Sequence, residues 1–343
     1  MQARWRAAMD RALYGPGGFF VSGPGPAEHF RTSAHASPAF ASALSSLASR
    51  LDAALGYPCP FDVVDVGAGR GELLLALAAL ARDAAGPPAA APLASRLRLT
   101  AVEKAPRPDD LPARIGWTDE IPDAVTGLLL ATEWLDNVPL DVAAPGPDGW
   151  RYLLVNPATG EEATGGPLSA GDVDWLARWW PSPAPIDAAG ERVEIGRSRD
   201  EAWAGAVRRL DRGVAVAVDY GHLRESRPMG GTLTGYRGGR QVPPVPDGSC
   251  DVTAHVAMDS VAAAGERVAG RAYTLVSQRE ALRALGADGG RPPLALAATD
   301  SAGYVRALAA ASAVAELTDP AGLGGHYWLL QPVGVAVDPL MAR

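Results

Sequence analysis

One stretch of the sequence, residues 61–81, constrains the fold more than any other. It begins with an apolar, β-branched run, Phe61-Asp-Val-Val-Asp-Val66, passes through Gly67-Ala-Gly-Arg-Gly71 and continues into a segment rich in leucine and alanine. The run is typical of a strand buried inside a parallel sheet, and the last segment favours a helix. Three glycines in five residues remove most of the Cβ atoms that would keep a ligand away from the backbone. The stretch therefore predicts a strand, a ligand-binding turn and a helix in direct succession.

Strands and helices are predicted to alternate along the rest of the chain. Short apolar or β-branched runs predict strands at 97–103, 125–132, 214–219 and 326–331, and residues 272–285 predict a strand followed by a helix. Such alternation, with glycines and acidic residues at the strand ends, is typical of a doubly wound, Rossmann-like α/β sheet. The two C-terminal strands are expected to form an antiparallel edge.

The sheet is expected to be preceded by helices and interrupted twice. The interrupting segments are rich in tryptophan in one case and in glycine and proline in the other. We expect an N-terminal helical segment at 1–60, the first part of the core at 61–142, an insertion at 143–211, a core strand at 212–221, an insertion or cap at 222–270 and the C-terminal part of the core at 271–343.

The charge balance limits the kinds of partner. Lys and Arg number 31 against 39 for Asp and Glu, which gives a formal net charge of −8. No basic tract is present, so a nucleic-acid surface, which would need clustered positive charge, is not expected. A cationic ligand or a basic partner fits this balance better.

Signals for targeting, membranes and metals are weak. The N-terminal residues lack the apolar core of a secretory signal, and the longest apolar run, 73–81, is too short to span a bilayer. Cys59 and Cys250 are too few for a disulfide framework or a sulfur-based metal site, and the five histidines lack ligand spacing. We expect a cytoplasmic protein with no metal ion and no membrane partner. The sequence leaves the oligomeric state open.

The spacing of the glycine loop points to a particular ligand. A dinucleotide fingerprint would have its third glycine one place later and would leave the helix N-terminus free for a pyrophosphate. Here Glu72 opens the helix and Asp65 precedes the first glycine by two residues. This arrangement suits S-adenosylmethionine, which has no phosphate and carries an ammonium and a sulfonium that a carboxylate attracts. A tight turn without a ligand is the alternative. We expect Gly67, Ala68, Gly69 and Gly71 to bind S-adenosylmethionine.

Acidic residues follow the other predicted strands. Glu103 ends the second strand, where its carboxylate could accept both ribose hydroxyls, although it could also be a solvated surface acid. Glu133 and Asp136 follow the third strand, where they could hold a cationic substrate or steer the charge of the methyl donor. A helix start with a capping acid would explain these two equally well. Asp219 ends a further strand and could face the substrate or stabilise a turn.

Eight motifs occur along the chain in the order and spacing of one known family. They are Ala12-Leu-Tyr-Gly-Pro-Gly-Gly-Phe-Phe20, Phe30-Arg-Thr-Ser33, Gly67-Ala-Gly-Arg-Gly71, Val102-Glu103, Glu133-Trp-Leu-Asp-Asn-Val-Pro139, Val218-Asp-Tyr-Gly221, Gly231-Thr-Leu-Thr-Gly-Tyr-Arg237 and Asp251-Val-Thr-Ala-His-Val256. In these motifs the chain resembles the MidA family of S-adenosylmethionine-dependent methyltransferases. That family includes the mitochondrial complex I assembly-factor arginine methyltransferase.

The resemblance implies a class I methyltransferase fold, S-adenosylmethionine as donor and a methyl acceptor that is a protein or a small molecule. It implies that Thr32 and Ser33 fold over the donor, that Glu133 also contacts the donor, and that Glu133 and Asp136 are the catalytic acids. The chain departs from the family at Glu28-His29, at Ala34 and at Thr132. The acceptor could therefore be a protein arginine, or a small molecule or peptide. A further alternative is a non-catalytic assembly factor that keeps the fold and methylates nothing. A nicotinamide-dependent oxidoreductase is disfavoured by the glycine spacing.

Overall fold

A seven-stranded sheet forms the centre of the protein in its computed structural model, which describes residues 2–22, 37–83, 90–180, 191–287 and 289–341. The strands lie in the order β16–β17–β10–β5–β2–β3–β4. Neighbouring strands are parallel except where β17 pairs with β10 and β16. This order and the single reversed strand confirm the doubly wound class I methyltransferase sheet. Its strands are β2 (Phe61–Val66), β3 (Leu97–Val102), β4 (Ile115–Thr118), β5 (Val125–Thr132), β10 (Leu210–Asp219), β16 (Thr274–Ser277) and β17 (Tyr327–Val333).

The predicted strands are present in the main sheet, and one further strand of that sheet was missed. The strands expected at 97–103, 125–132, 214–219 and 326–331 are β3, β5, β10 and β17, and the antiparallel C-terminal edge is formed by β16 and β17. The missed strand is β4, which has only four residues and a glycine inside it. Of these, only Ile115 is buried, so β4 lacks the apolar run that marks its neighbours.

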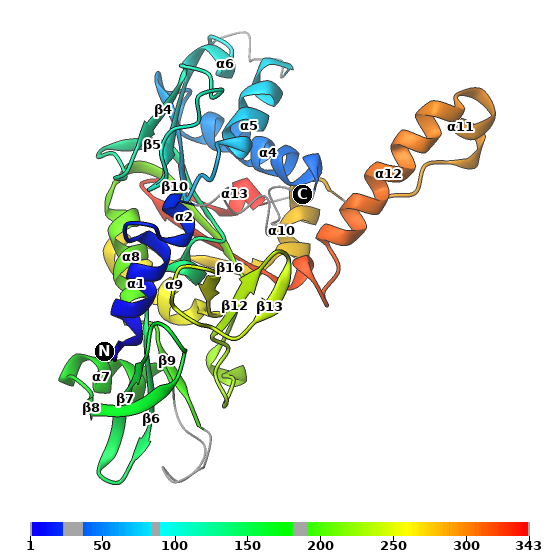
Figure 1. Cartoon of the computed structure of the whole chain (residues 1–343). Helices are drawn as coiled ribbons and strands as arrows, with labels where there is room; N and C mark the ends of the chain where they lie inside the picture. The colour runs from blue at the N-terminus through cyan, green and yellow to red at the C-terminus, as the bar shows by residue number, and fades with distance from the viewer. Residues whose placement is uncertain (1, 23–36, 84–89, 181–190, 288, 342–343) are drawn as a thin grey trace.

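Helices cover both faces of the sheet (Figure 1). Alternate residues of each strand point to opposite faces, so Leu128 and Leu130 join one buried cluster while Leu129 and Ala131 join the other. The first cluster includes side chains from α4 (Pro38–Ala54), α5 (Glu72–Asp83) and α10 (Gln278–Ala284), and the second from α8 (Arg197–Arg208) and α9 (Met258–Ala269). Strands buried on both faces read as continuous apolar runs, which explains why they could be found from the sequence.

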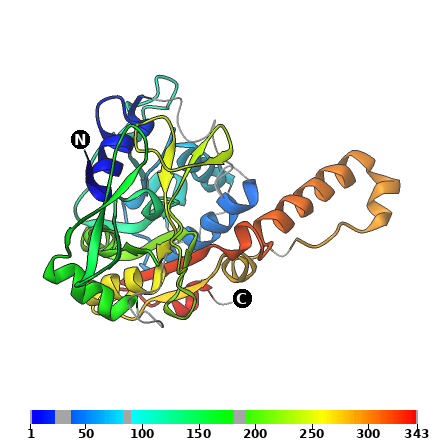
Figure 2. The same cartoon turned by 60° about the horizontal axis from the view of Figure 1, so that its bottom comes forward.

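The expected division of the chain stays a prediction, and several elements cross its boundaries. Both α8 and α9 fall within the segments expected as insertions, yet they pack on the main sheet. Residues 294–313 fall within the segment expected as the C-terminal core, yet they project from it (Figures 1 and 2). They belong to α11 (Leu294–Thr299) and α12 (Ser301–Leu317).

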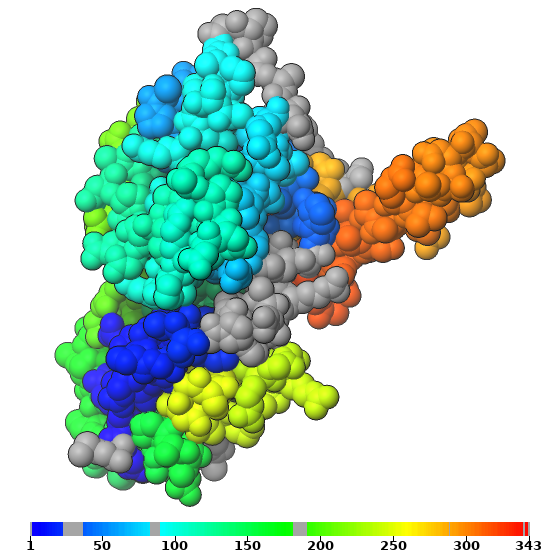
Figure 3. Space-filling model, turned by 45° about the horizontal axis from the view of Figure 1, so that its top comes forward, coloured from blue at the N-terminus to red at the C-terminus, as the bar shows by residue number. Residues whose placement is uncertain are grey.

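A second, antiparallel sheet lies beside the first and includes the N-terminus. Its central strands, β6 (Asp141–Gly146) and β7 (Gly149–Val155), pair with each other. Strand β1 (Ala3–Arg4) pairs with β7, and Arg4 forms an ion pair with Asp141. The N-terminal helices therefore lie between the main-sheet core and the inserted segments (Figure 3). The remaining strands of this sheet are β8 (Glu162–Pro167) and β9 (Val193–Ile195). The helices in this part of the chain are α1 (Trp5–Tyr14), α2 (Phe19–Ser22) and α7 (Ala170–Trp179).

Short elements complete the fold around the edge of the main sheet. Strands β12 and β13 form a hairpin, and β14 pairs with the other edge of β12. No helix among the described residues combines the length and the apolar character needed to cross a membrane. The short elements are α6 (Leu93–Arg96), η2 (Leu135–Asn137), β11 (Gly221–His222), η3 (Arg224–Ser226), β12 (Thr234–Arg237), β13 (Arg240–Val242), β14 (Asp251–Thr253), β15 (Val256–Ala257), η4 (Leu323–Gly325) and α13 (Asp338–Met341).

Candidate active site

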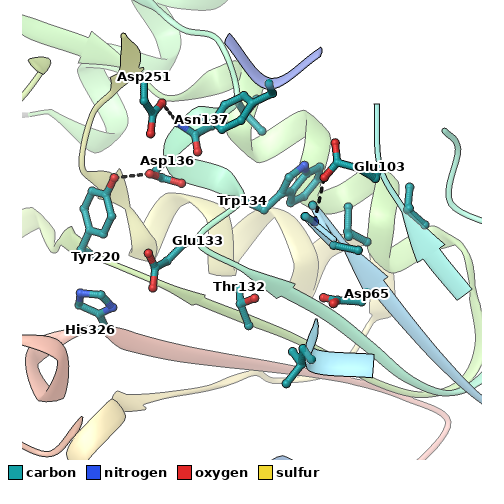
Figure 4. Close-up of a pocket in the computed structure, with 18 of the residues that line it drawn as sticks. Asp65, Glu103, Thr132, Glu133, Trp134, Asp136, Asn137, Tyr220, Asp251 and His326 are labelled. Atoms are coloured by element: carbon teal, nitrogen blue, oxygen red, sulfur yellow. Dashed lines mark hydrogen bonds between the residues drawn. The ribbon is translucent and has the colours of Figure 1, made fainter. Parts of the chain in front are cut away.

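A pocket of about 880 Å³ opens at the carboxyl ends of the parallel strands. Its walls include the residues that follow β2, β3, β5 and β10, and Figure 4 shows several of them around one hollow. Ligands bind at this edge of α/β sheets because the loops after parallel strands converge there. The pocket brings together most of the predicted site residues: Gly67, Ala68, Gly69, Glu103, Glu133 and Asp136. Gly71 does not line it, and Thr32 and Ser33 lie outside the described residues.

The glycine loop turns sharply after β2. Gly67, Gly69 and Gly71 have φ angles of +73°, +57° and +85°, in the left-handed region that other residues rarely adopt. A Cβ atom on Gly67 would lie 3.2 Å from Trp134 Cδ1, and one on Gly71 would lie 2.9 Å from Leu111 Cδ1. The backbone conformation thus accounts for all three glycines, and the close Cβ contacts add a steric reason at the first and third positions. Gly71 is buried and shapes the loop from behind.

Glu103 is tied to the loop by its carboxylate. Its Oε2 accepts a hydrogen bond from the Gly69 N–H at 3.0 Å, and its Oε1 accepts from the N–H groups of Lys104 at 2.6 Å and Ala105 at 3.2 Å. A carboxylate has about four acceptor positions, so one position, on Oε2, is left for a ligand. Burial raises the pKa of Glu103, and the backbone N–H groups oppose that rise. The expectation that Glu103 accepts both ribose hydroxyls would require one of these backbone bonds to be released.

Asp65 lies beneath the loop with an unused oxygen. Its side chain is buried and lines the pocket, and Oδ1 has no hydrogen-bond partner within the described chain. Burial, followed by the nearby charges of Glu103 and Glu72, raises the pKa of Asp65 to about 8. When the pKa of a buried carboxylate is raised in this way, a cation placed against it strongly stabilises the ionised form. The donor's ammonium and sulfonium groups meet that requirement, so the residues present fit S-adenosylmethionine.

The turn after β5 is held from behind by Asp219. The carboxylate of Asp219 accepts hydrogen bonds from the N–H groups of Leu135 at 3.0 Å, Asp136 at 3.2 Å and Tyr220 at 3.0 Å. The side chain is fully buried and does not line the pocket. Of the two alternatives open for Asp219, the structure favours the turn acid. Within the same turn, Glu133 adopts a φ of +49°.

Asp136 points into the pocket from this turn and is held on one oxygen only (Figure 4). Its Oδ2 accepts hydrogen bonds from the hydroxyl groups of Tyr220 and, at 2.7 Å, Thr253, whereas Oδ1 has no partner among the residues described. Burial raises the pKa of Asp136, and the bonds from Tyr220 and Thr253 and the charge of Arg199 oppose the rise. The carboxylate is therefore fixed in place with one acceptor oxygen unused.

Arg199 supports this end of the pocket from below. Its buried guanidinium donates to the backbone carbonyls of Asp136, of Val138 at 3.1 Å, and of Ala254 and His255, each at 2.9 Å. These bonds join the turn after β5 to the segment after β14. The arginine thus fixes the distance between two walls of the site without lining it.

A third carboxylate and the N-terminal segment meet at the same end. Asn137 donates from Nδ2 to Asp251 Oδ1 at 2.7 Å, and the hydroxyl of Tyr14 donates to the Asn137 carbonyl at 3.2 Å. Burial and the charge of Asp136 raise the pKa of Asp251 well above its ordinary value. Tyr14 and Asp251 belong to motifs noted in the sequence, but neither was predicted as a site residue.

Two histidines flank Tyr220. The rings of His255 and His326 lie 5.2 and 5.6 Å from the Tyr220 ring, centroid to centroid. Burial lowers both pKa values, that of His326 to about 4, so His326 is neutral at pH 7. Within the described ranges, no group of three or more His, Cys, Asp or Glu side chains could hold a metal ion.

Tyr220, Thr253 and His326 are pocket or network residues that sequence reasoning missed. Tyr220 and Thr253 lie inside two of the family motifs, Val218-Asp-Tyr-Gly221 and Asp251-Val-Thr-Ala-His-Val256, and that was the available signal. His326 belongs to no motif.

A sheet of this order, a glycine loop after β2 and acids at the ends of β3 and β5 define a class I methyltransferase. Residues 46–276 match the model of a family described as S-adenosyl-L-methionine-dependent methyltransferases, and the chain belongs to that family. This membership confirms the resemblance to the MidA methyltransferases. The protein is therefore an enzyme, and its methyl donor is S-adenosylmethionine.

Two crystal structures of COG1565 superfamily proteins from Burkholderia thailandensis share the fold. One, bound to S-adenosyl-homocysteine, has a TM-score of 0.79 and 23% identity over 100% of this chain and 91% of its own. The other, a native crystal structure, has a TM-score of 0.73 and 23% identity over 100% of this chain and 90% of its own. No curated protein sequence matches the chain.

Proposed function

We propose that this methyltransferase acts on a nitrogen acceptor that reaches the pocket as a cation, and that the guanidinium of a protein arginine is the leading candidate. The observation that carries the proposal is the gathering of Glu133, Asp136 and Asp251 at the end of the pocket away from the glycine loop (Figure 4). The arginine and lysine side chains among the described lining residues, Arg70 and Lys104, lie at the loop end. A cation is attracted to the acidic end, whereas an anionic acceptor would be repelled from it.

The donor would occupy the loop end. Gly67, Ala68 and Gly69 are proposed to contact its amino-acid part, with Asp65 against its ammonium. Glu103 is proposed to accept one ribose hydroxyl at its remaining position. The earlier expectations that Gly71 contacts the donor and that Thr32 and Ser33 fold over it stay predictions. Glu133, which lies between Asp136 and Thr132 in Figure 4, is proposed to face both donor and acceptor.

When bound, the donor supplies an electrophilic methyl group on sulfur. Alignment of the acceptor nitrogen with that methyl group can supply about 7–11 kcal/mol of the barrier reduction. A carbon–sulfur bond breaks, a carbon–nitrogen bond forms, and the acceptor nitrogen loses one proton. We assign Asp136 to orient the acceptor through Oδ1, and Asp136 or Glu133 to receive the proton. The hydrogen bonds from Tyr220 and Thr253 hold the Asp136 carboxylate in one rotamer while this happens.

The test is methyl transfer from labelled S-adenosylmethionine to two otherwise identical sets of peptides, one with arginine and one with glutamine at the central position. Labelled arginine peptides and unlabelled glutamine peptides would support the proposal, and mass spectrometry would give the nitrogen. An Asp136→Asn variant should bind the donor as the wild type does and lose at least about 100-fold in transfer rate, since a charged acceptor would lose its partner. Transfer to neutral acceptors only would refute the cationic acceptor. Tight donor binding with no transfer to any acceptor would favour a non-catalytic assembly factor.

A further inference from the structure

A helical hairpin that contains no buried residue projects from the protein. Residues 294–313, here called the arm, comprise α11 and most of α12, and both views show them pointing away from the body (Figures 1 and 2). None of the arm residues is buried, and the buried residues of α12, Val314 and Leu317, lie in its last turns. Within the part of the chain that the structure describes, the arm is anchored at its base, where α12 packs near α4 and η4.

The exposed arm is apolar. Leu294 is 78% exposed, Val305 63% and Leu308 39%, and most of the remaining arm residues are alanine. Its charged side chains are Asp300 and Arg306, which lie 3.8 Å apart and cancel in charge. Helices that are apolar on every side are normally buried, and a contiguous apolar surface on a soluble body marks a contact site.

We propose that a second copy of this chain covers the arm, so that the protein is a homodimer joined through residues 294–313 of both copies. An arm without net charge offers nothing to an anionic membrane or to nucleic acid, both of which are held through clustered basic side chains. It offers equally little to a basic protein, which would be drawn instead to the acidic body. The arm presents a non-polar surface, and the same non-polar surface on a second copy would match it.

The size and shape of the arm also fit a dimer. The arm contains 20 residues, namely the six of α11, Asp300 and the first 13 of α12. This number is at the lower end of the about 20–30 residues that a standard interface uses from each partner. Alanine-rich helices approach one another closely, toward the lower end of the 8–10 Å range of interaxial distances. Two arms related by a twofold axis would place the two hairpins together as a short four-helix bundle, in which each copy buries the same patch.

The experiment is sedimentation velocity over a range from nanomolar to tens of micromolar, with the full chain. Variants Val305→Glu and Leu308→Glu place a charge on the arm, and Val173→Glu places the same charge on α7, where Val173 is 49% exposed. The wild type and Val173→Glu should be dimers with the same dissociation constant. Each arm variant should raise that constant at least about 30-fold, the size expected for a central interface residue.

Circular dichroism and thermal unfolding show whether each variant is folded. We expect folded monomers, because the substituted side chains are exposed to solvent in the single chain. A wild-type protein that is monomeric at tens of micromolar overturns the proposal, whether or not the arm binds some other molecule. Arm variants that dimerise as tightly as Val173→Glu would overturn it as well. Because the readout is mass and not turnover, neither outcome depends on the proposed acceptor.

Discussion

Tyr220 donates its hydroxyl hydrogen to Asp136, and the two residues come from the turns that follow two neighbouring strands, β10 and β5. The same oxygen of Asp136 contacts Thr253 at 2.7 Å, so both hydroxyl groups meet Oδ2. Oδ1 is buried and has no partner among the residues described, and it is the oxygen that we propose for the acceptor. Through this hydrogen bond, the position of Tyr220 at the end of β10 affects whether Asp136 is ionised at the proposed acceptor site.

Replacement of Tyr220 by phenylalanine tests that link. The hydrogen bond lowers the pKa of Asp136 against the effect of burial, so its loss should raise that pKa further. If the ionised carboxylate is the active form, the acid limb of the pH–rate profile should move to higher pH, and donor affinity should stay within about 2-fold of the wild type. The lost bond should also reduce the free energy of unfolding by about 1–2 kcal/mol.

Tyr273→Phe is the matched control, because Tyr273 is a half-buried tyrosine away from the pocket. It should leave both stability and the pH profile unchanged. An unmoved acid limb in Tyr220→Phe would remove Asp136 from its proposed role and leave Tyr220 as a packing residue.

Asp65→Asn tests whether the buried acid under the glycine loop is kept for a cation. With a folded pKa of about 8 and an unfolded value of about 3.9, the folded protein holds a proton that the unfolded chain has released. Its stability should therefore fall as pH rises through that window, and asparagine, which cannot ionise, should escape the fall. The Tm of Asp65→Asn relative to wild type, without donor, should increase from pH 5 to pH 8 and level off above pH 9.

The same substitution should weaken donor binding at pH 8.5 by at least about 10-fold, since the cation would lose its carboxylate. Asp109→Asn, which removes an exposed acid next to Asp110, the ion-pair partner of Arg70, should follow the wild type at every pH. A constant Tm difference across the pH range would show that Asp65 does not titrate in this window. Unchanged donor affinity would show that the donor's cationic part lies elsewhere.

Glu103→Ala tests the proposed ribose contact. The variant loses one acceptor position for the ribose and also releases the Gly69 N–H, so donor affinity should fall at least about 10-fold. Calorimetric titration with S-adenosylmethionine and S-adenosylhomocysteine measures the change, and Glu120→Ala, at an exposed acid beyond β4, is the control. Titration with adenosine separates the two effects, because it retains the ribose but has no methionine part to meet the loop. Wild-type affinity for all three ligands would rule out the ribose assignment.

The strands and the loop end of the site could be predicted because their signals are local. A strand buried on both faces needs consecutive apolar side chains, and the glycines are required where they stand by the backbone conformation. Glu103 and Glu133 could be placed because acids that follow parallel strands meet at one edge. Strand β4 lacked such a run, and a single buried residue, Ile115, was too little to reveal it.

The acceptor end depends on contacts between distant segments, which a single sequence does not encode locally. Tyr220 and Thr253 are 84 and 117 residues from Asp136, and both meet the same carboxylate. Arg199 reads in sequence as an ordinary residue of a polar helix, yet it is buried and holds the carbonyls of two separate turns. From the sequence Asp219 could face the substrate or stabilise a turn, and only the fold shows that its oxygens accept from backbone N–H groups.

Gly71→Ala tests whether the third glycine shapes the loop without touching the donor. The new Cβ would lie 2.9 Å from Leu111 Cδ1 at a φ of +85°, so the substitution combines a steric conflict with left-handed strain and should cost about 1–3 kcal/mol of stability. Gly230→Ala is the control, since its Cβ would meet open space and its φ is not in the left-handed region, and it should be neutral or slightly stabilising. If Gly71 acts only through loop shape, adding Leu111→Ala should remove the steric part of the conflict, and donor affinity should recover in the double variant relative to Gly71→Ala. Recovery of stability without recovery of affinity would instead mean that Gly71 meets the donor directly.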